Sequence, residues 1–410
     1  MLQDQIVSQL RKYEVPYEKF VMGAKFQHLL LHQDLTAVSY DEEKGIADFL
    51  EYLMRTNDWE GIYEGDYIIG AKKDKMTIML KLGGQIEWAM APTARLQEVD
   101  RAYLDFIQSI MSELSSRGQI LISVGAQPKT AAKDIQVVPM ALNEALLASL
   151  KDDEAATELL KTAAKSVITL SYAHSDDFEK KLNVVQLISP VLAAIFDNVP
   201  LRAAAEVTEH CANQELINKA KSQLFREARA VAKDSFKYKD YANYAVNMPV
   251  VAVADGEGLA AKDGLAVSAY EGKEVSEDEA EAVLNMVQSD IKITPDGIEI
   301  SVVDALPYPL NMAYMALLKG SFSHKEHMDD IVDSFKELTE IQLMELKRAV
   351  CNEGLEAKFG EGTLLDYAKD LYFMVMPTME PLEQHYIQPL DMVLFKGAIP
   401  KKVLARQLMK

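Results

Sequence analysis

The chain has 410 residues, of which 49% are hydrophobic and 26% are charged, so it is long enough to bury one large core or two smaller ones. Its formal net charge of -20 argues against a surface that binds nucleic acid or an anionic membrane, because phosphate groups would repel it. Two cysteines, Cys211 and Cys351, are too few for a disulfide framework, and the sequence contains neither a signal-peptide pattern nor an apolar run of membrane-spanning length. These features predict a cytoplasmic protein without a nucleic-acid or membrane partner.

The first third of the sequence predicts a β-rich platform with flanking helices. Apolar residues at helical spacing predict helices near residues 2–13, 45–54 and 96–117. Short extended runs predict strands at residues 23–31, 67–71, 76–82 and 85–91. Gly83 and Gly84 fall between the last two runs and predict a tight hairpin, because such a turn needs a positive φ at a glycine.

The rest of the sequence predicts mainly helices with three further strand regions. Residues 119–125, 166–172 and 297–303 have strand composition, and a helix from Asp177 should be kinked by Pro190. Residues 254–272 are rich in Gly, Asp and Glu and predict a surface loop, which a capping-box pattern at 276–279 ends. The chain after residue 303 is predicted to be helical to its end.

These elements predict a single α+β domain, residues 1–410, built on an antiparallel sheet. We expect a β-rich N-terminal part at 1–135, central helices with closing strands at 136–305, and a helical C-terminal part at 306–410.

Common local motifs for phosphate and metal binding are absent from the sequence. It contains no Gly-x-x-x-x-Gly-Lys-Ser/Thr loop and no Gly-x-Gly-x-x-Gly between a strand and a helix. His324 and His327 are three residues apart but have no third ligand nearby, so we predict a solvated helix start there. Cys351 has apolar neighbours and is predicted to be a packing residue.

Four longer segments, taken in order, carry a more specific pattern. They are residues 23–28 (Gly-Ala-Lys-Phe-Gln-His), 80–87 (Leu-Lys-Leu-Gly-Gly-Gln-Ile-Glu), 166–200 (ending Phe-Asp-Asn-Val-Pro) and 298–307 (Ile-Glu-Ile-Ser-Val-Val-Asp-Ala-Leu-Pro). Residues 241–249 and 312–320 add two weaker blocks. In this order the segments resemble the ATP-dependent glutamate-cysteine ligases of the plant and proteobacterial type, over nearly the whole chain.

The resemblance implies a fold like that of glutamine synthetase, with a curved antiparallel sheet that forms an open funnel for ATP and magnesium ions. Such enzymes phosphorylate the γ-carboxylate of glutamate, and the amine of cysteine then attacks the acyl phosphate. The product, γ-glutamylcysteine, serves glutathione-type thiol biosynthesis. The resemblance assigns catalytic positions to Glu87 and Glu299. The positions that it assigns to substrate and ATP binding are Gln85, Arg226, Arg229 and Asp304.

The sequence departs from the family pattern at the residues that should hold the metal. The family's first segment carries two acidic residues two apart on one strand face, and these positions are Lys25 and Gln27 here. A third acidic position is Lys81, and Ser301 stands where the family has an arginine for an anion. Two Glu-to-Lys changes and one Glu-to-Gln change make the expected pocket five charge units more positive, which disfavours divalent cations.

Three interpretations follow. In the first, the chain is a ligase that uses ATP and Mg²⁺ but has impaired or lost catalysis, because Glu87 and Glu299 supply few ligands for magnesium. In the second, it is a non-catalytic paralogue that needs no cofactor and binds or regulates a partner such as an active paralogue. Lys25 and Lys81 then stand where the ions would be and stabilise the empty fold. In the third, it is a ligase with a different amine substrate whose lysines contact nucleotide phosphates directly.

Each candidate residue also has a structural explanation. Gln85 and Glu87 follow a hairpin and fit an ordinary sheet, while Glu299 and Asp304 fit acceptors for backbone donors. The arginines at 226 and 229 fit surface charges equally well. A one-residue slip in the match would also turn the side chains at 27 and 81 to the opposite face of the sheet.

Overall fold

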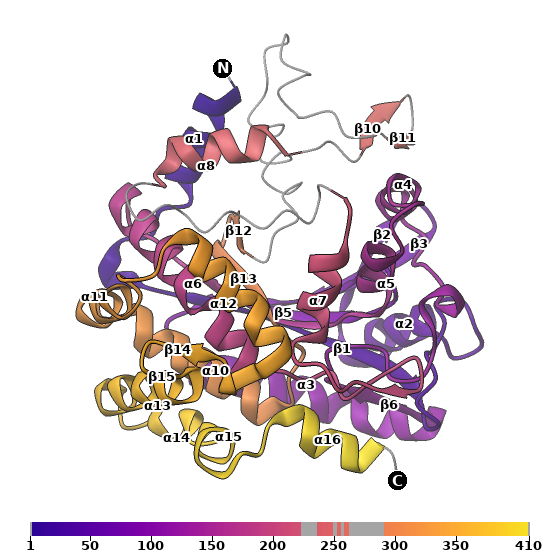
Figure 1. The fold of residues 1–410 in the computed structure, drawn as a ribbon. Helices are drawn as coiled ribbons and strands as arrows, with labels where there is room; N and C mark the ends of the chain where they lie inside the picture. Colours follow the sequence, from indigo (N-terminus) through magenta and orange to yellow (C-terminus); the bar gives the residue numbers. More distant parts are fainter. Residues whose placement is uncertain (1, 223–235, 249–251, 256–257, 262–290, 409–410) are drawn as a thin grey trace.

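One antiparallel sheet carries most of the residues singled out by the sequence. The computed structural model describes residues 2–408 apart from 223–235, 249–251, 256–257 and 262–290 (Figure 1). Within this part of the chain, nine strands pair in the order β12-β13-β7-β1-β5-β4-β3-β2, and β6 pairs with β1. Their bounds are β1 Met22–His32, β2 Glu60–Glu64, β3 Tyr67–Lys73, β4 Met76–Leu80, β5 Ile86–Thr93, β6 Gln119–Ile122, β7 Lys165–Leu170, β12 Ile291–Thr294 and β13 Gly297–Asp304.

The side chains of β1 alternate between the two faces of the sheet. Phe26 is fully buried, whereas Lys25 and Gln27 are partly buried on the opposite face, as the two-residue repeat of a strand requires. The Phe26 ring stacks on Trp88 of β5 with 5.7 Å between centroids, and it meets Tyr103 edge-on at 5.5 Å. This aromatic cluster fixes the register, because a slip by one residue would move these rings out of the core.

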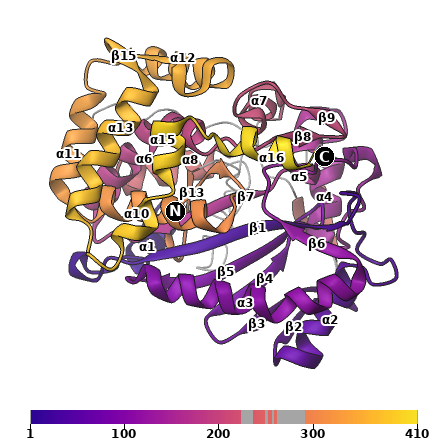
Figure 2. The ribbon, with the colours of Figure 1, turned by 90° about the horizontal axis from the view of Figure 1, so that it is seen from below.

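Helices cover the aromatic face of the sheet. α3 (Leu96–Arg117) contacts β5, α6 (Ser175–Ile195) contacts β13, and α10 (Tyr308–Phe322) contacts β1. Figure 2 shows α3 running along one side of the sheet and the C-terminal helices gathered together beside it. Those helices are α11 Lys325–Ser334, α12 Glu340–Glu353, α13 Leu364–Val375, α14 Gln384–Ile387, α15 Leu390–Lys396 and α16 Pro400–Leu408. One hydrophobic cluster reaches from Leu2 of the first helix to Leu394 of α15, whereas Leu404 and Leu408 of α16 pack against a separate, smaller cluster.

A second, smaller group of elements lies near the opposite face. α4 (Ala141–Ser149) and α5 (Glu154–Thr162) lie beside the β4–β5 hairpin, and α7 (Ala212–Lys219) packs on α5 (Figure 1). A short hairpin of β10 (Ala252–Asp255) and β11 (Gly258–Ala261) contacts α4. The remaining elements are α1 Leu2–Lys12, α2 Ile46–Asn57, α8 Tyr238–Val246, β8 Leu201–Arg202, β9 Ala205–Glu206, β14 Lys358–Phe359 and β15 Gly362–Thr363.

A buried ion pair fixes the start of α6 to the sheet. Lys181 is 1% exposed, and its Nζ lies 2.9 Å from Asp177 Oδ2 and donates to the Ser171 carbonyl at 2.7 Å. Asp177 also accepts a hydrogen bond from the backbone N–H of Ala173 at 2.8 Å. The Lys181 ammonium lies 4.8 Å from the centroid of the Phe20 ring, a cation–π distance. Burial lowers the pKa of Lys181, and the Asp177 carboxylate opposes this effect.

The predicted α+β class, antiparallel sheet and N-terminal strands are confirmed, and the hairpin has Gly84 at φ +81°. The predicted helix is present as α6, which extends from Ser175 to Ile195 with Pro190 inside it, and the kink at Pro190 stays a prediction. Two details are wrong. The strands β10 and β11 lie partly within residues 254–272, where a loop was predicted. The strands β14 and β15 interrupt the C-terminal part, which was predicted to be helical throughout. Pairs this short leave no periodic pattern.

Two predictions, the capping box and the division of the chain into three parts, stay untested. The capping box at 276–279 lies outside the described residues. The three-part division of the chain stays a prediction. Along the part of the chain that the structure describes, no helix combines the length and apolarity needed to cross a membrane.

Candidate functional site

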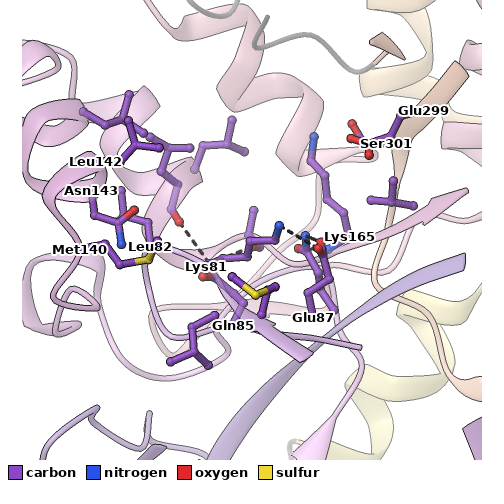
Figure 3. A pocket seen from close by; sticks show the side chains of 18 of the residues that line it. Lys81, Leu82, Gln85, Glu87, Met140, Leu142, Asn143, Lys165, Glu299 and Ser301 are labelled. Atoms are coloured by element: carbon purple, nitrogen blue, oxygen red, sulfur yellow. Dashed lines mark hydrogen bonds and ion pairs between the residues drawn. The ribbon is translucent and has the colours of Figure 1, made fainter. Parts of the chain in front are cut away.

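The face of the sheet opposite the aromatic core lines a cavity of about 440 Å³ (Figure 3). Strands β4, β5, β7, β12 and β13 contribute to its wall together with α4, α5 and α7. One end is apolar, and the other end contains lysine, glutamate and glutamine side chains from neighbouring strands. The sequence positions expected to hold metal lie at this charged end because β1, β5, β7 and β13 are adjacent in the sheet.

Glu299 is bound by two lysines. Lys25 of β1 forms an ion pair with Glu299 Oε2, and Lys292 of β12 lies 3.2 Å from Glu299 Oε1. Burial opposes ionisation of Glu299, which is 6% exposed, but Lys292 and Lys25 lower its pKa to about 2. Burial likewise opposes the charge of Lys25, yet Glu299 and Glu87 together raise the pKa of Lys25 above its ordinary value. Both groups are therefore charged at neutral pH.

Glu87 is bound in the same way on the adjacent strand. Its Oε1 lies 2.8 Å from Lys81 Nζ, and its Oε2 accepts a hydrogen bond from Gln27 Nε2 at 2.8 Å (Figure 3 draws the Lys81 pair). The side-chain Oε1 of Gln27 accepts a hydrogen bond from the backbone N–H of Lys165 at 2.9 Å. The orientation of the Gln27 side-chain amide is therefore fixed by contacts at both its nitrogen and its oxygen. Burial opposes ionisation of Glu87, but Lys81 and Lys25 hold its pKa below the ordinary value. Lys81 and Gln27 thus face the cavity side, not the opposite face.

These contacts do not fit a magnesium ion. Magnesium needs several hard oxygen ligands in near-octahedral geometry. Each of the two carboxylates at this end is already bound by at least one ammonium group, and a cation there would meet like charge. Across the described residues, no group of three or more His, Cys, Asp or Glu side chains is arranged to hold a metal.

Gln85 contacts backbone groups at the side of the cavity. Its Oε1 accepts the N–H of Gly83 at 3.0 Å, and its Nε2 donates to the carbonyls of Leu160 and Ala163 at 3.1 and 2.9 Å. The side chain is 1% exposed. A Cβ at Gly83 would lie 2.0 Å from the Lys161 carbonyl oxygen, so the hairpin turn touches the end of α5. Gln85 therefore holds the β4–β5 turn onto that helix.

Asp304 lies at the far end of β13, next to a different set of residues. It accepts hydrogen bonds from the Asn198 N–H at 2.9 Å and from Asn213 Nδ2 at 2.7 Å. Burial and the charge of Asp197 raise the pKa of Asp304 to about 6. Ser301 lines the charged end of the cavity, and Arg226 and Arg229 lie outside the described residues. The roles assigned to these residues by resemblance stay predictions.

Two lysines at the charged end were not identified from the sequence. Lys292 and Lys165 both line the cavity, from β12 and β7. Lys292 lies between buried Ile291 and Ile293, an alternation that indicates a strand with its lysine on the opposite face. That signal was available, but its partner Glu299 becomes evident only from the pairing of β12 with β13.

We expect Glu299→Gln to destabilise the fold near neutral pH, and the loss to shrink as the pH falls. The ionised carboxylate stabilises the folded state above its unfolded-state pKa of 4.5, and this contribution disappears as the pH drops toward the folded pKa of about 2. That shift corresponds to about 3 kcal/mol. Urea unfolding of the native and variant proteins across this pH range measures the difference. Exposed Glu361→Gln is the control; a difference that does not change with pH contradicts the prediction.

Comparisons with known proteins find one family whose members match nearly the whole chain. The model of glutamate-cysteine ligase family 2 (GCS2) matches residues 27–406. The chloroplastic glutamate-cysteine ligase A of Oryza sativa subsp. indica is 22% identical over 402 residues, covering 95% of this chain and 81% of the relative. The chloroplastic glutamate-cysteine ligase of Arabidopsis thaliana is 22% identical over 382 residues, covering 90% and 72%.

A solved structure is also similar. The crystal structure of glutamate-cysteine ligase from Francisella tularensis in complex with AMP matches with a TM-score of 0.53 and 12% identity, covering 95% of this chain and 85% of the other. At this identity the likeness shows a shared fold.

Proposed function

Because this chain belongs to glutamate-cysteine ligase family 2, we propose that it keeps the fold of an ATP-dependent ligase but has lost magnesium-dependent formation of γ-glutamylcysteine, and that it acts by binding a small molecule in the cavity. The observation that carries the proposal is the binding of Glu87 and Glu299 by lysine side chains. These are the two acidic positions of the expected metal site that the sequence retains.

The chemistry explains why such a site is a poor ligase. Transfer of the γ-phosphoryl group depends on positioning and on metal ions that neutralise developing charge between the phosphates. A bound metal ion contributes several kcal/mol of this stabilisation, which is lost when the site does not hold the ion. Lysines at 25 and 81 supply positive charge, but each carries a single charge on a hydrogen-bond donor and does not replace the charge neutralisation that a divalent ion would supply.

A second candidate follows from the lysines that line the cavity. Lys81, Lys165 and Lys292 are positioned around the charged end, and lysine binds phosphate as a point charge. A ligase that contacts ATP through these lysines, with a different amine as acceptor, is compatible with this arrangement. Nucleotide-dependent turnover without magnesium distinguishes it from a binding protein. A regulatory role toward an active paralogue and a cytoplasmic location are further proposals that rest on the sequence.

We expect no glutamate- and cysteine-dependent release of ADP from the purified protein supplied with ATP and Mg²⁺. A coupled ADP assay measures this, with an active chloroplastic glutamate-cysteine ligase assayed in parallel as the positive control. The matched negative control is Glu87→Ala with Glu299→Ala, which removes both carboxylates and should give the same background rate as the native protein. Turnover that requires both amino acids and falls to background in this variant overturns the proposal.

A further inference from the structure

We propose that the charged end of the cavity binds an anionic head group directly through lysines, without a divalent cation, and that the apolar end takes an apolar or flat aromatic body. The ligand class is therefore an amphipathic phosphate or carboxylate. The inference rests on the proposed function, since it specifies what a non-catalytic cavity of this kind binds.

The charged end of the cavity is locally positive. Among the residues that the structure describes, it has one excess positive charge in a protein whose formal net charge is -20, and this count includes Asp296, whose charge acts on Lys25. A positive recess in an acidic molecule concentrates its field on an anion that enters. The groups counted are Lys25, Lys81, Lys165, Lys292, Glu87, Glu299 and Asp296.

The charged groups at this end lie at different depths. Both glutamate side chains are 8% exposed, whereas Lys81 is 41%, Lys292 27% and Lys25 22% exposed. The carboxylates therefore lie beneath the ammonium groups that bind them. A ligand that enters the cavity meets the positive groups first, and an ammonium group with three N–H donors can bind a carboxylate and a ligand oxygen together. This order favours anions and disfavours cations.

The remaining wall of the cavity is apolar and leaves room for an organic ligand. The apolar end is formed by side chains from the β4–β5 hairpin, α4, α5 and α7, among them Met79, Leu82, Leu142, Leu160 and Ile217. A volume of about 440 Å³ suits a small organic ligand and exceeds what an inorganic ion needs. Burial of an apolar body at this end supplies affinity that the lysines alone would not, because their carboxylate partners compete for them.

Side-chain hydrogen bonds to the backbone hold the cavity wall in place. The Gln85 side chain donates to two carbonyls at the end of α5 and so fixes the β4–β5 turn to that helix. The Gln27 side chain accepts the Lys165 N–H and so connects β1 to β7. The strands that carry the lysines and the helix that carries the apolar wall are therefore held at fixed positions without a ligand.

Two ligand pairs test the inference, each consisting of an anion and its neutral counterpart. AMP with adenosine represents a phosphate ester, and octanoate with octanol represents a carboxylate. Isothermal titration in EDTA should show binding of at least one anion roughly tenfold tighter than its neutral counterpart, since charge-assisted hydrogen bonds add affinity. The pair that shows the difference indicates whether the bound head group is a phosphate ester or a carboxylate. Added Mg²⁺ should not strengthen binding.

Variants locate the binding. Lys81→Met and Lys292→Met should each weaken the bound anion roughly tenfold while leaving its neutral counterpart unchanged. Exposed Lys336→Met, outside the cavity, is the matched control and should behave like the native protein. Thermal unfolding of each variant shows whether it is folded before titration. A loss that is equal in Lys336→Met contradicts the location.

Failure of this inference is separable from failure of the proposed function. If the neutral compounds bind as well as the anions, the cavity is a binding site but not an anion site. If no probe binds and turnover is also absent, the inference is overturned while the loss of catalysis stands. If an anion binds only with Mg²⁺, and amino-acid-dependent turnover follows, both are overturned.

Discussion

The triple variant Lys25→Glu, Gln27→Glu, Lys81→Glu will bind divalent cations that the native protein does not bind. The three changes add three carboxylates around Glu87 and Glu299 and remove the ammonium groups of Lys25 and Lys81, which makes the site five charge units more negative. Without a cation, the clustered carboxylates repel one another and lower the stability of the fold. With a cation the repulsion is relieved, and a metal present at one hundredfold its Kd stabilises the folded state by about 2.7 kcal/mol.

Thermal unfolding with and without Mg²⁺ or Mn²⁺ measures the gain directly. We expect the melting temperature of the triple variant to rise with metal and that of the native protein to stay constant. The matched control places the same charge change on exposed positions, as Lys336→Glu, Gln388→Glu, Lys396→Glu. An equal response in this control attributes the effect to net charge, and no response in the triple variant shows that these positions do not form a metal site.

Asp177→Ala should cost about 3 to 5 kcal/mol in the free energy of unfolding, because it leaves the Lys181 ammonium buried without its carboxylate. The Ser171 carbonyl and the Phe20 ring remain as partners, but neither neutralises the charge. Because burial already lowers the pKa of Lys181, the loss should be smaller at high pH, where the lysine is more easily deprotonated. Urea unfolding at neutral and alkaline pH gives both values.

A double-mutant cycle separates the charge from the packing. Asp177→Ala combined with Lys181→Met removes both charges, and Met keeps most of the apolar stem of the lysine. We expect the double variant to recover a large part of the loss seen in Asp177→Ala. Losses that simply add indicate that the two side chains stabilise α6 independently, contrary to the contact in the structure.

The charged end of the cavity could be predicted in part. Lys25 and Gln27 share a strand, and strand alternation places both side chains on one face. The glycine hairpin predicts that β4 pairs with β5, which places Glu87 opposite Met79. Glu87 lies opposite Gln27 only because β5 also pairs with β1, and those two residues are 60 positions apart in the sequence.

The position of Glu299 at the charged end depends on pairing between strands that are far apart in the sequence. Glu299 reaches Lys25 only because β13 pairs with β7 and β7 with β1, a separation of 274 residues. Local patterns give each strand but not the order of strands, so Lys292 was not identified as a partner of Glu299. Gln85 illustrates the same limit, since its acceptors at Leu160 and Ala163 lie at the end of a helix far along the chain.

The pairing of lysines with the retained glutamates also bears on how this lineage can evolve. A single Lys25→Glu change would place a second carboxylate beside Glu299, with Lys292 as its neighbour, and would still supply too few ligands for magnesium. A single Lys81→Glu change would do the same beside Glu87. Either single step is expected to lower stability without providing a magnesium site. On the proposal that this site has lost its ions, a return to metal binding therefore needs several substitutions together.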